Sequence, residues 1–203
     1  MLSVDVFVIA DTLQYSRQSY QNRARIRTPH GTQWLSIPIK GGQHGRAIHA
    51  VERDARFPWQ RKHQKALVYN YRSSPFFSHF EIPVSQVLAH DETHLLPILR
   101  RSMHCIVDAF RPSCDIVYTS ELPGAPRTLT AIAKQYTEHT MLSLADAFLH
   151  DAQHVPDVQP FMYAEQPYRQ NFDGFEPTLS SLDVLFNHGP DARRLVLSGI
   201  KPR

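Results

Sequence analysis

Asp5-Val-Phe-Val-Ile-Ala-Asp11 is a short apolar run enclosed by two acidic residues. This pattern is typical of a strand that is buried on both faces in a parallel sheet. Ligands of open α/β sheets bind at the carboxyl ends of such strands. We therefore expect Asp11 and the nearby Gln14 to belong to a functional site. A turn or helix cap is the alternative role for Asp11.

Strand and helix patterns alternate along the rest of the chain. Strands are expected over residues 33–39, 47–51, 115–119, 140–144 and 158–163, and helices over 59–71, 82–87, 95–110, 129–136 and 191–197. Thr128 is expected to cap the helix over 129–136, and a further helix is expected between a Ser180 cap and Gly189. Pro38 places its strand at a sheet edge, because proline has no backbone N–H to donate. The alternation predicts an α/β fold with a mostly parallel sheet flanked by helices.

The size and composition of the chain predict a single compact domain over residues 1–203. Of the 203 residues, 42% are hydrophobic and 20% are charged, which excludes a disordered protein. A chain of this length can bury a core without disulfides or a structural metal. No apolar run approaches the roughly 18 residues of a membrane span, and no secretory leader is present. We therefore expect a cytoplasmic protein without membrane insertion; its oligomeric state stays open.

Positive charge gathers in two segments of the chain. There are 22 Lys and Arg residues against 19 Asp and Glu, so the net charge is +3, which is too small to indicate nucleic-acid binding. Four arginines lie within residues 17–27, and five basic residues lie within residues 53–65. An anionic small molecule would explain both clusters, and two solvated faces are the alternative.

Several polar side chains are candidates for substrate contact or proton transfer. His63 is the candidate acid or base, because imidazole titrates near neutral pH, and the adjacent Arg61 and Lys62 could hold an anion. The alternative is that these three residues form a solvated helix face. The remaining candidates are polar side chains that could contact a phosphate or sugar, each with a structural role as its alternative: Asn22, Arg23, Gln170 and Asn187.

The acidic, histidine and hydroxyl motifs of the chain indicate no other chemistry. Asp183 is interpreted as a partner of the helix dipole in the first turn after Ser180. His90 and His94, like His150 and His154, have the spacing of two ligands on one helical face. A third ligand is missing from the pattern, so no metal site is predicted. Neither a nucleophile elbow nor a phosphate-binding loop is found, and no cofactor is predicted.

Several segments in consistent order together resemble the WbqC-like family of bacteria. They are Asp11–Tyr15, Asn22-Arg23, Trp34–Pro38, Arg61–His63, Asn70-Tyr71, Ser120–Leu122, Tyr168–Gln170 and residues 175–190. Members of this family often sit with surface-polysaccharide genes. The resemblance implies a transferase that adds a glycyl, aminoacyl or other acyl group to a nucleotide-linked amino sugar.

Two departures from the family pattern favour a different role. Family members usually begin with a further segment before the strand that corresponds to residues 5–11, and this chain starts almost at that strand. Either Met1 is an internal methionine and the true start lies upstream, or the chain lacks this segment. Relatives also tend to have a glycine-rich turn where this chain has Leu142-Ser-Leu-Ala-Asp146. The alternative to the transferase is therefore a noncatalytic protein that binds nucleotide sugars or serves in assembly. Either function predicts an anionic small molecule, such as a nucleotide sugar, as the partner.

Overall fold

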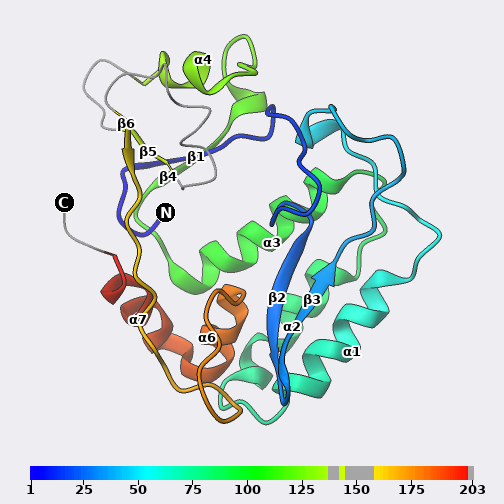
Figure 1. Ribbon diagram of the computed structural model, residues 1–203, viewed down its shortest axis with the longest axis vertical. Helices are drawn as coiled ribbons and strands as arrows, with labels where there is room; N and C mark the ends of the chain where they lie inside the picture. Colours follow the sequence, from blue (N-terminus) through cyan, green and yellow to red (C-terminus); the bar gives the residue numbers. More distant parts are fainter. Residues whose placement is uncertain (137–141, 145–157, 201–203) are drawn as a thin grey trace.

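The computed structural model describes residues 1–136, 142–144 and 158–200, and Figure 1 shows the arrangement of their elements. Strand β1 (Val6–Ile9) pairs in parallel with β4 (Asp115–Tyr118), so that Val6 lies opposite Asp115 and Ile9 opposite Tyr118. Both strands were expected from their apolar runs. However, all four residues of β1 are half-buried, so the expectation of burial on both faces is wrong. Among the described strands, β1 pairs with β4 only.

The second pair is an antiparallel hairpin of β2 (Arg23–Thr28) and β3 (Gly31–Ser36). The expected strand at residues 33–39 is thus shifted toward the N-terminus, and Pro38 follows it. No strand was expected at β2, whose sequence Arg-Ala-Arg-Ile-Arg-Thr was interpreted as a charge cluster. Its buried Ile26 faces the core, and the backbone N–H of Arg27 donates to the Tyr71 hydroxyl at 2.8 Å.

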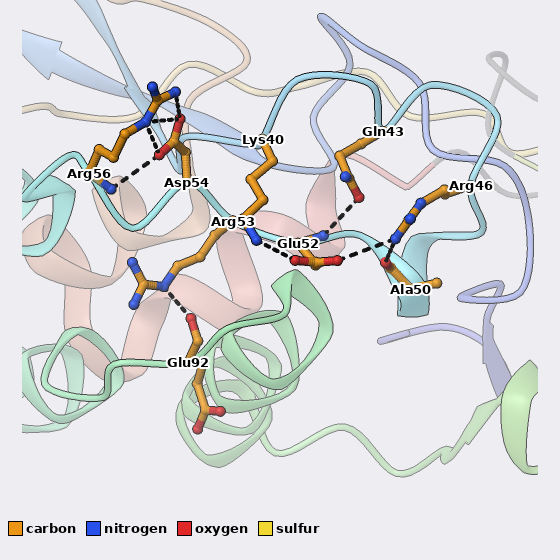
Figure 2. A network of polar contacts seen from close by, with 9 residues as sticks. All are labelled: Lys40, Gln43, Arg46, Ala50, Glu52, Arg53, Asp54, Arg56 and Glu92. Atoms are coloured by element: carbon orange, nitrogen blue, oxygen red, sulfur yellow. Dashed lines mark hydrogen bonds and ion pairs between the residues drawn. The ribbon is translucent and has the colours of Figure 1, made fainter.

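A loop between the hairpin and α1 is held by a polar network (Figure 2). Glu52 accepts from Lys40 Nζ at 2.5 Å and from Arg46 at 3.4 Å, while its backbone N–H donates to the Gln43 amide oxygen. The Arg53 side chain donates a hydrogen bond to the Glu92 carbonyl, and the Arg56 guanidinium donates to both carboxylate oxygens of Asp54. The strand expected at residues 47–51 is wrong: Ile48–Ala50 forms a 3-10 turn, η1, whose Ile48 N–H bonds the Leu13 carbonyl.

Three helices follow in sequence. Helix α1 (Trp59–Tyr71) and helix α3 (Leu95–Phe110) have the expected bounds, and Pro97 lies in the first turn of α3. Helix α2 (Phe77–Leu88) begins five residues before the expected residues 82–87. The additional first turns place Phe77 in the core and Phe80 against it, and the helix continues past Pro83.

The C-terminal half closes the fold with short elements. The 3-10 turn η2 (Thr119–Glu121) follows β4, and α4 (Leu129–Ala133) is shorter than the expected helix but has the expected Thr128 cap. Strands β5 (Leu142–Leu144) and β6 (Val158–Pro160) pair in parallel. Helix α6 (Ser181–His188) starts at the Ser180 cap, and η3 (Gly189–Asp191) leads into α7 (Ala192–Ser198).

The largest core cluster joins the hairpin to helices α1, α2 and α6. Phe186 is fully buried, and its ring centroid lies 5.0 Å from Tyr71 and 5.2 Å from Phe77. Ile26 and Leu67 belong to the same cluster. The fold is therefore α/β in one compact domain, although its sheets are small. No helix within the described ranges is long and apolar enough to cross a membrane.

Candidate functional site

Asp11 lies where the sequence places it, directly after β1, and its carboxylate is fully buried. One carboxylate oxygen accepts from the Thr119 hydroxyl at 2.9 Å and the Ser120 N–H at 2.8 Å; the other accepts from the Ser120 hydroxyl at 2.6 Å. Thr119 and Ser120 follow β4. Because β1 and β4 are parallel, their carboxyl ends meet, and residues more than 100 positions apart form one cluster, which we call the Asp11 cluster.

His49 is a member of this cluster that the sequence analysis missed. Its backbone N–H donates to the Asp11 carbonyl at 2.9 Å, and its Nδ1 lies 3.0 Å from the same oxygen. A carbonyl only accepts, so Nδ1 carries the proton and Nε2 presents a lone pair. The side chain is half-buried. Only the turn at Ile48–Ala50 brings His49 to Asp11, and no local sequence pattern indicates that contact.

Arg100 supplies positive charge beside the Asp11 carboxylate. Its guanidinium lies 3.8 Å from Asp11 Oδ2, pairs with Glu121 at 2.6 Å and covers the Tyr118 ring at 3.9 Å from the centroid. Burial raises the pKa of Tyr118, an effect that Arg100 opposes. Arg100 projects from α3, which crosses the centre of the view in Figure 1. The cluster therefore combines a carboxylate, two hydroxyls, an imidazole and a guanidinium.

Three of the other expected site residues hold loops around the hairpin. Gln14 is exposed and bridges Ala47 in a single antiparallel pair. Asn22 donates its amide to the Ile37 carbonyl at 2.8 Å. Arg23 donates to the Ser19 carbonyl and stacks over Trp34, with 4.1 Å from its guanidinium carbon to the ring centroid. The structure does not gather these three side chains around the Asp11 carboxylate.

His63 lies on α1, away from the Asp11 cluster. Its Nε2 is 3.1 Å from the Ser36 carbonyl, and its ring meets Trp59 edge-on at 5.0 Å. Burial lowers the pKa of His63 to about 4, so the side chain is neutral at pH 7. Proton transfer by His63 stays a prediction. Arg61 and Lys62 are both exposed on the same helix.

A second buried cluster surrounds Asp183, which was interpreted as a dipole partner only. Its two oxygens accept from the Tyr71 hydroxyl at 2.7 Å and the Tyr168 hydroxyl at 2.8 Å. Burial raises the pKa of Asp183. Asn187 donates to the Asp183 carbonyl at 2.8 Å, while Gln170 exchanges two hydrogen bonds with the backbone of Glu176. Both amides are therefore engaged in holding local backbone.

Among the described residues, two groups line hollows on the surface. One hollow, of about 770 Å³, runs between β3 and α1 and contains Arg61 but neither Lys62 nor His63. The other, of about 510 Å³, is mainly apolar and is lined by aromatic side chains that include Tyr20, Phe110, Tyr163 and Tyr168. Thus Tyr168 joins the Asp183 cluster to the wall of the second hollow.

The described residues contain no group of three or more histidine, cysteine, aspartate or glutamate side chains that could hold a metal. His90 and His94 flank the loop before α3, so they do not share a helical face as their spacing suggested. His150 and His154 lie outside the described residues, as do Ala145 and Asp146 of the expected glycine-turn region.

Comparison with known proteins places the chain in a family. The model of the WbqC-like protein family matches residues 1–195. The uncharacterised protein Rv1507c of Mycobacterium tuberculosis is 30% identical over 200 residues, which cover 93% of this chain and 86% of that protein. No solved structure matches the chain significantly. Since the family model spans nearly the whole sequence, this chain belongs to the WbqC-like protein family.

Proposed function

We propose that this protein transfers an aminoacyl or other acyl group from an activated donor, such as a thioester, to the amine of a nucleotide-linked amino sugar in surface-polysaccharide biosynthesis. The observation that carries the proposal is the Asp11 cluster. In this cluster the main-chain carbonyl of Asp11 contacts the His49 imidazole, and the Asp11 carboxylate accepts from the Thr119 and Ser120 hydroxyls at the carboxyl ends of two parallel strands. Two segments that carry the family resemblance, Asp11–Tyr15 and Ser120–Leu122, meet at this centre.

The reaction needs a base, because an ammonium has no lone pair with which to attack. In the proposed step the sugar amine attacks the carbonyl carbon of the donor, a C–N bond forms, and the bond to the leaving group breaks. The His49 Nε2 accepts the proton that the amine loses and returns it to the leaving thiolate or alkoxide, so the imidazole ends neutral. The contact of Nδ1 with the Asp11 carbonyl holds Nε2 in the accepting state.

Asp11 has a positioning role in this proposal. Both of its carboxylate oxygens already accept hydrogen bonds from Thr119 or Ser120, so neither is directed at a substrate. These bonds fix the end of β4 against the end of β1 and thereby place His49 relative to Ser120. Arg100 offers positive charge near the oxygen that becomes negative during acyl transfer.

The test is transfer in vitro, followed by mass spectrometry. The purified chain is incubated with a glycyl thioester and a panel of nucleoside-diphosphate amino sugars, and the glycylated sugar is measured. We expect His49→Gln to lower turnover by about 100-fold or more with the fold intact. The matched control is His63→Gln, which replaces a histidine whose Nε2 is engaged with the Ser36 carbonyl. Equal turnover in the His49 variant and the wild type would exclude His49 from the chemistry.

A noncatalytic binding protein is the second candidate function. It is favoured by the hollow between β3 and α1, which presents positive charge away from the Asp11 cluster. Calorimetry with the same sugars separates the two functions, since binding without any product would support the binding protein and contradict the transferase.

A further inference from the structure

The hollow between β3 and α1 is walled mainly by one face of the helix. Arg61, Lys65, Tyr69 and Arg72 follow one another along α1 and its C-terminal residue, and Gln33 faces them from β3. Figure 1 shows α1 beside the hairpin of β2 and β3. Residues of α1 and of β3 line the hollow. We call this surface the α1 groove. From Arg61 to Arg72 it extends about 16 Å at the usual helical rise.

The three cations of the α1 groove have no acidic partner among the described residues. Elsewhere, Arg46 pairs with Glu52 and Arg56 pairs with Asp54, as Figure 2 shows. In contrast, no ion pair within the described ranges involves Arg61, Lys65 or Arg72. Three unbalanced positive charges around one hollow favour an anionic ligand with more than one negative charge.

The spacing of the groove residues suggests the shape of that ligand. Arg61 and Lys65 are one helical turn apart, so their side chains can reach neighbouring phosphates. Tyr69 lies one turn further along and is 75% exposed, which leaves its ring face open to a planar group. Two cations followed by an open aromatic ring match a pyrophosphate joined to a base.

An unpartnered polar atom provides an independent observation. Asn70 lines the same hollow and is 3% exposed, yet its side-chain oxygen has no hydrogen-bond partner. Its amide nitrogen is already used, because it donates to the Ala66 carbonyl at 2.8 Å. A buried acceptor without a donor is costly, so the wall of the hollow holds one polar atom whose hydrogen-bonding capacity is unused.

We propose that the α1 groove binds a nucleoside diphosphate group, with the pyrophosphate at Arg61 and Lys65 and the base against Tyr69. This inference does not depend on transfer at the Asp11 cluster, because binding is measured without turnover. It also separates Arg61 from Lys62, which were expected to act together: Lys62 does not line the groove.

Calorimetry with uridine and adenosine diphosphates tests the proposal through a matched pair of variants. Lys65→Gln and Lys62→Gln remove the same charge from the same exposed helix, but only Lys65 lines the groove. We expect Lys65→Gln to weaken binding by about tenfold and Lys62→Gln by less than about twofold. An equal effect of both variants would show attraction by net charge only, and no binding at millimolar ligand would overturn the proposal.

Inorganic pyrophosphate and dextran sulfate identify the ligand class. Tyr69→Ala is expected to weaken binding of the nucleoside diphosphates by about fivefold and to leave pyrophosphate binding unchanged, because only the nucleosides offer a ring to stack. An unchanged affinity of Tyr69→Ala for the nucleoside diphosphates would overturn the placement of the base. Tighter binding of dextran sulfate than of any nucleotide would overturn the proposal in favour of a polyanion surface. Equal thermal midpoints would show that the variants are folded.

Discussion

Two buried aspartates in this fold have different partners and different consequences. Asp11 accepts bonds from the backbone and hydroxyls of Thr119 and Ser120, which ties two strand ends together. Asp183 accepts from two tyrosine hydroxyls, and burial raises its pKa. A raised carboxyl pKa means that the folded state holds its proton more tightly than the unfolded state does. Asp183 therefore lowers the stability of the folded state as the pH rises above the ordinary pKa of an aspartate carboxyl.

His63 allows a direct test of burial at the residue scale. Its pKa falls from about 6.5 to about 4 on folding, so the unfolded state takes up a proton first as pH falls. Its contribution to stability is complete above about pH 6.5 and is lost toward pH 4, by about 3 kcal/mol in total. We expect His63→Gln to show a smaller loss of unfolding free energy between pH 7 and pH 4 than the wild type, measured by urea unfolding.

The exposed His30 in the hairpin turn is the control for this measurement. His30→Gln should retain the wild-type pH dependence. An identical pH dependence of the His63 variant and the wild type would contradict the burial of the neutral imidazole.

At the residue scale, the sequence could predict Asp11 but not its partners. A polar residue that ends an apolar strand is a local signal, and the structure places Asp11 there. His49 and Ser120 reach Asp11 only through a distant turn and a distant strand, so no local pattern connects them. For Asp183, the sequence predicted the position in the helix but not the buried surroundings of the carboxylate. A capping pattern explains its position after Ser180, but the two tyrosines that bind its carboxylate lie 112 and 15 positions away, in other elements of the chain.

At the scale of elements, patterns of period and capping predicted most helices. The caps at Thr128 and Ser180 accept backbone N–H groups as expected, and α1 and α3 have the expected bounds. The strand β2 was not predicted, because its three arginines were interpreted as part of a charge cluster. Its alternation of arginine with Ala24 and Ile26 is the signal that identifies the strand, since Ile26 is buried in the core.

The junction of α6 with η3 gives a prediction for a backbone position. Gly189 has φ +52°, and a Cβ added there would lie 2.5–2.7 Å from the Phe76 ring. We expect Gly189→Ala to cost about 3 kcal/mol or more, because backbone strain and ring displacement act together. Gly174 also has positive φ, but a Cβ there meets nothing within 4 Å. Gly174→Ala should therefore cost only about 1 kcal/mol, measured by chemical unfolding. Equal costs would contradict the close packing at Phe76.

On the scale of the whole molecule, the α/β class follows from the sequence but the sheet arrangement does not. Alternating strand and helix patterns predict parallel pairing, and β1 pairs in parallel with β4 as expected. A mostly parallel sheet was expected, yet the described strands form three separate pairs. The reason is physical: the hairpin of β2 and β3 packs on α1 and α6 rather than beside β1, and the core forms there around Phe186.

The polar network of Figure 2 predicts acid sensitivity of the whole molecule. Hydrogen bonds from Arg56 lower the pKa of Asp54 to about 2, and bonds from Lys40 and Arg101 lower the pKa of Glu52 and Glu92. A carboxyl whose pKa is lowered by folding stabilises the folded state above about pH 4. This stabilisation is lost as the pH falls toward the pKa of the carboxyl in the folded state. We expect the thermal midpoint of Asp54→Asn to lie below that of the wild type at pH 6, and the gap between them to narrow steadily as the pH falls toward about 2.

Arg56→Gln serves as the partner variant, since it removes the donor rather than the acceptor. It should show the same narrowing of the gap in calorimetric scans. A gap that stays constant from pH 6 to pH 2.5 would mean that the Asp54 carboxylate does not stabilise the fold through its charge.

The pairing of β1 with β4 also has a consequence for synthesis on the ribosome. Val6 pairs with Asp115, which is synthesised 109 positions later. At about 5–20 residues per second, the first strand leaves the ribosome several seconds or more before its partner exists. Closing so long a loop is slow, so the hairpin of β2 and β3, with its near neighbours, can form first. The emerging chain thus carries an apolar strand that must be kept from other chains until its partner strand has been synthesised.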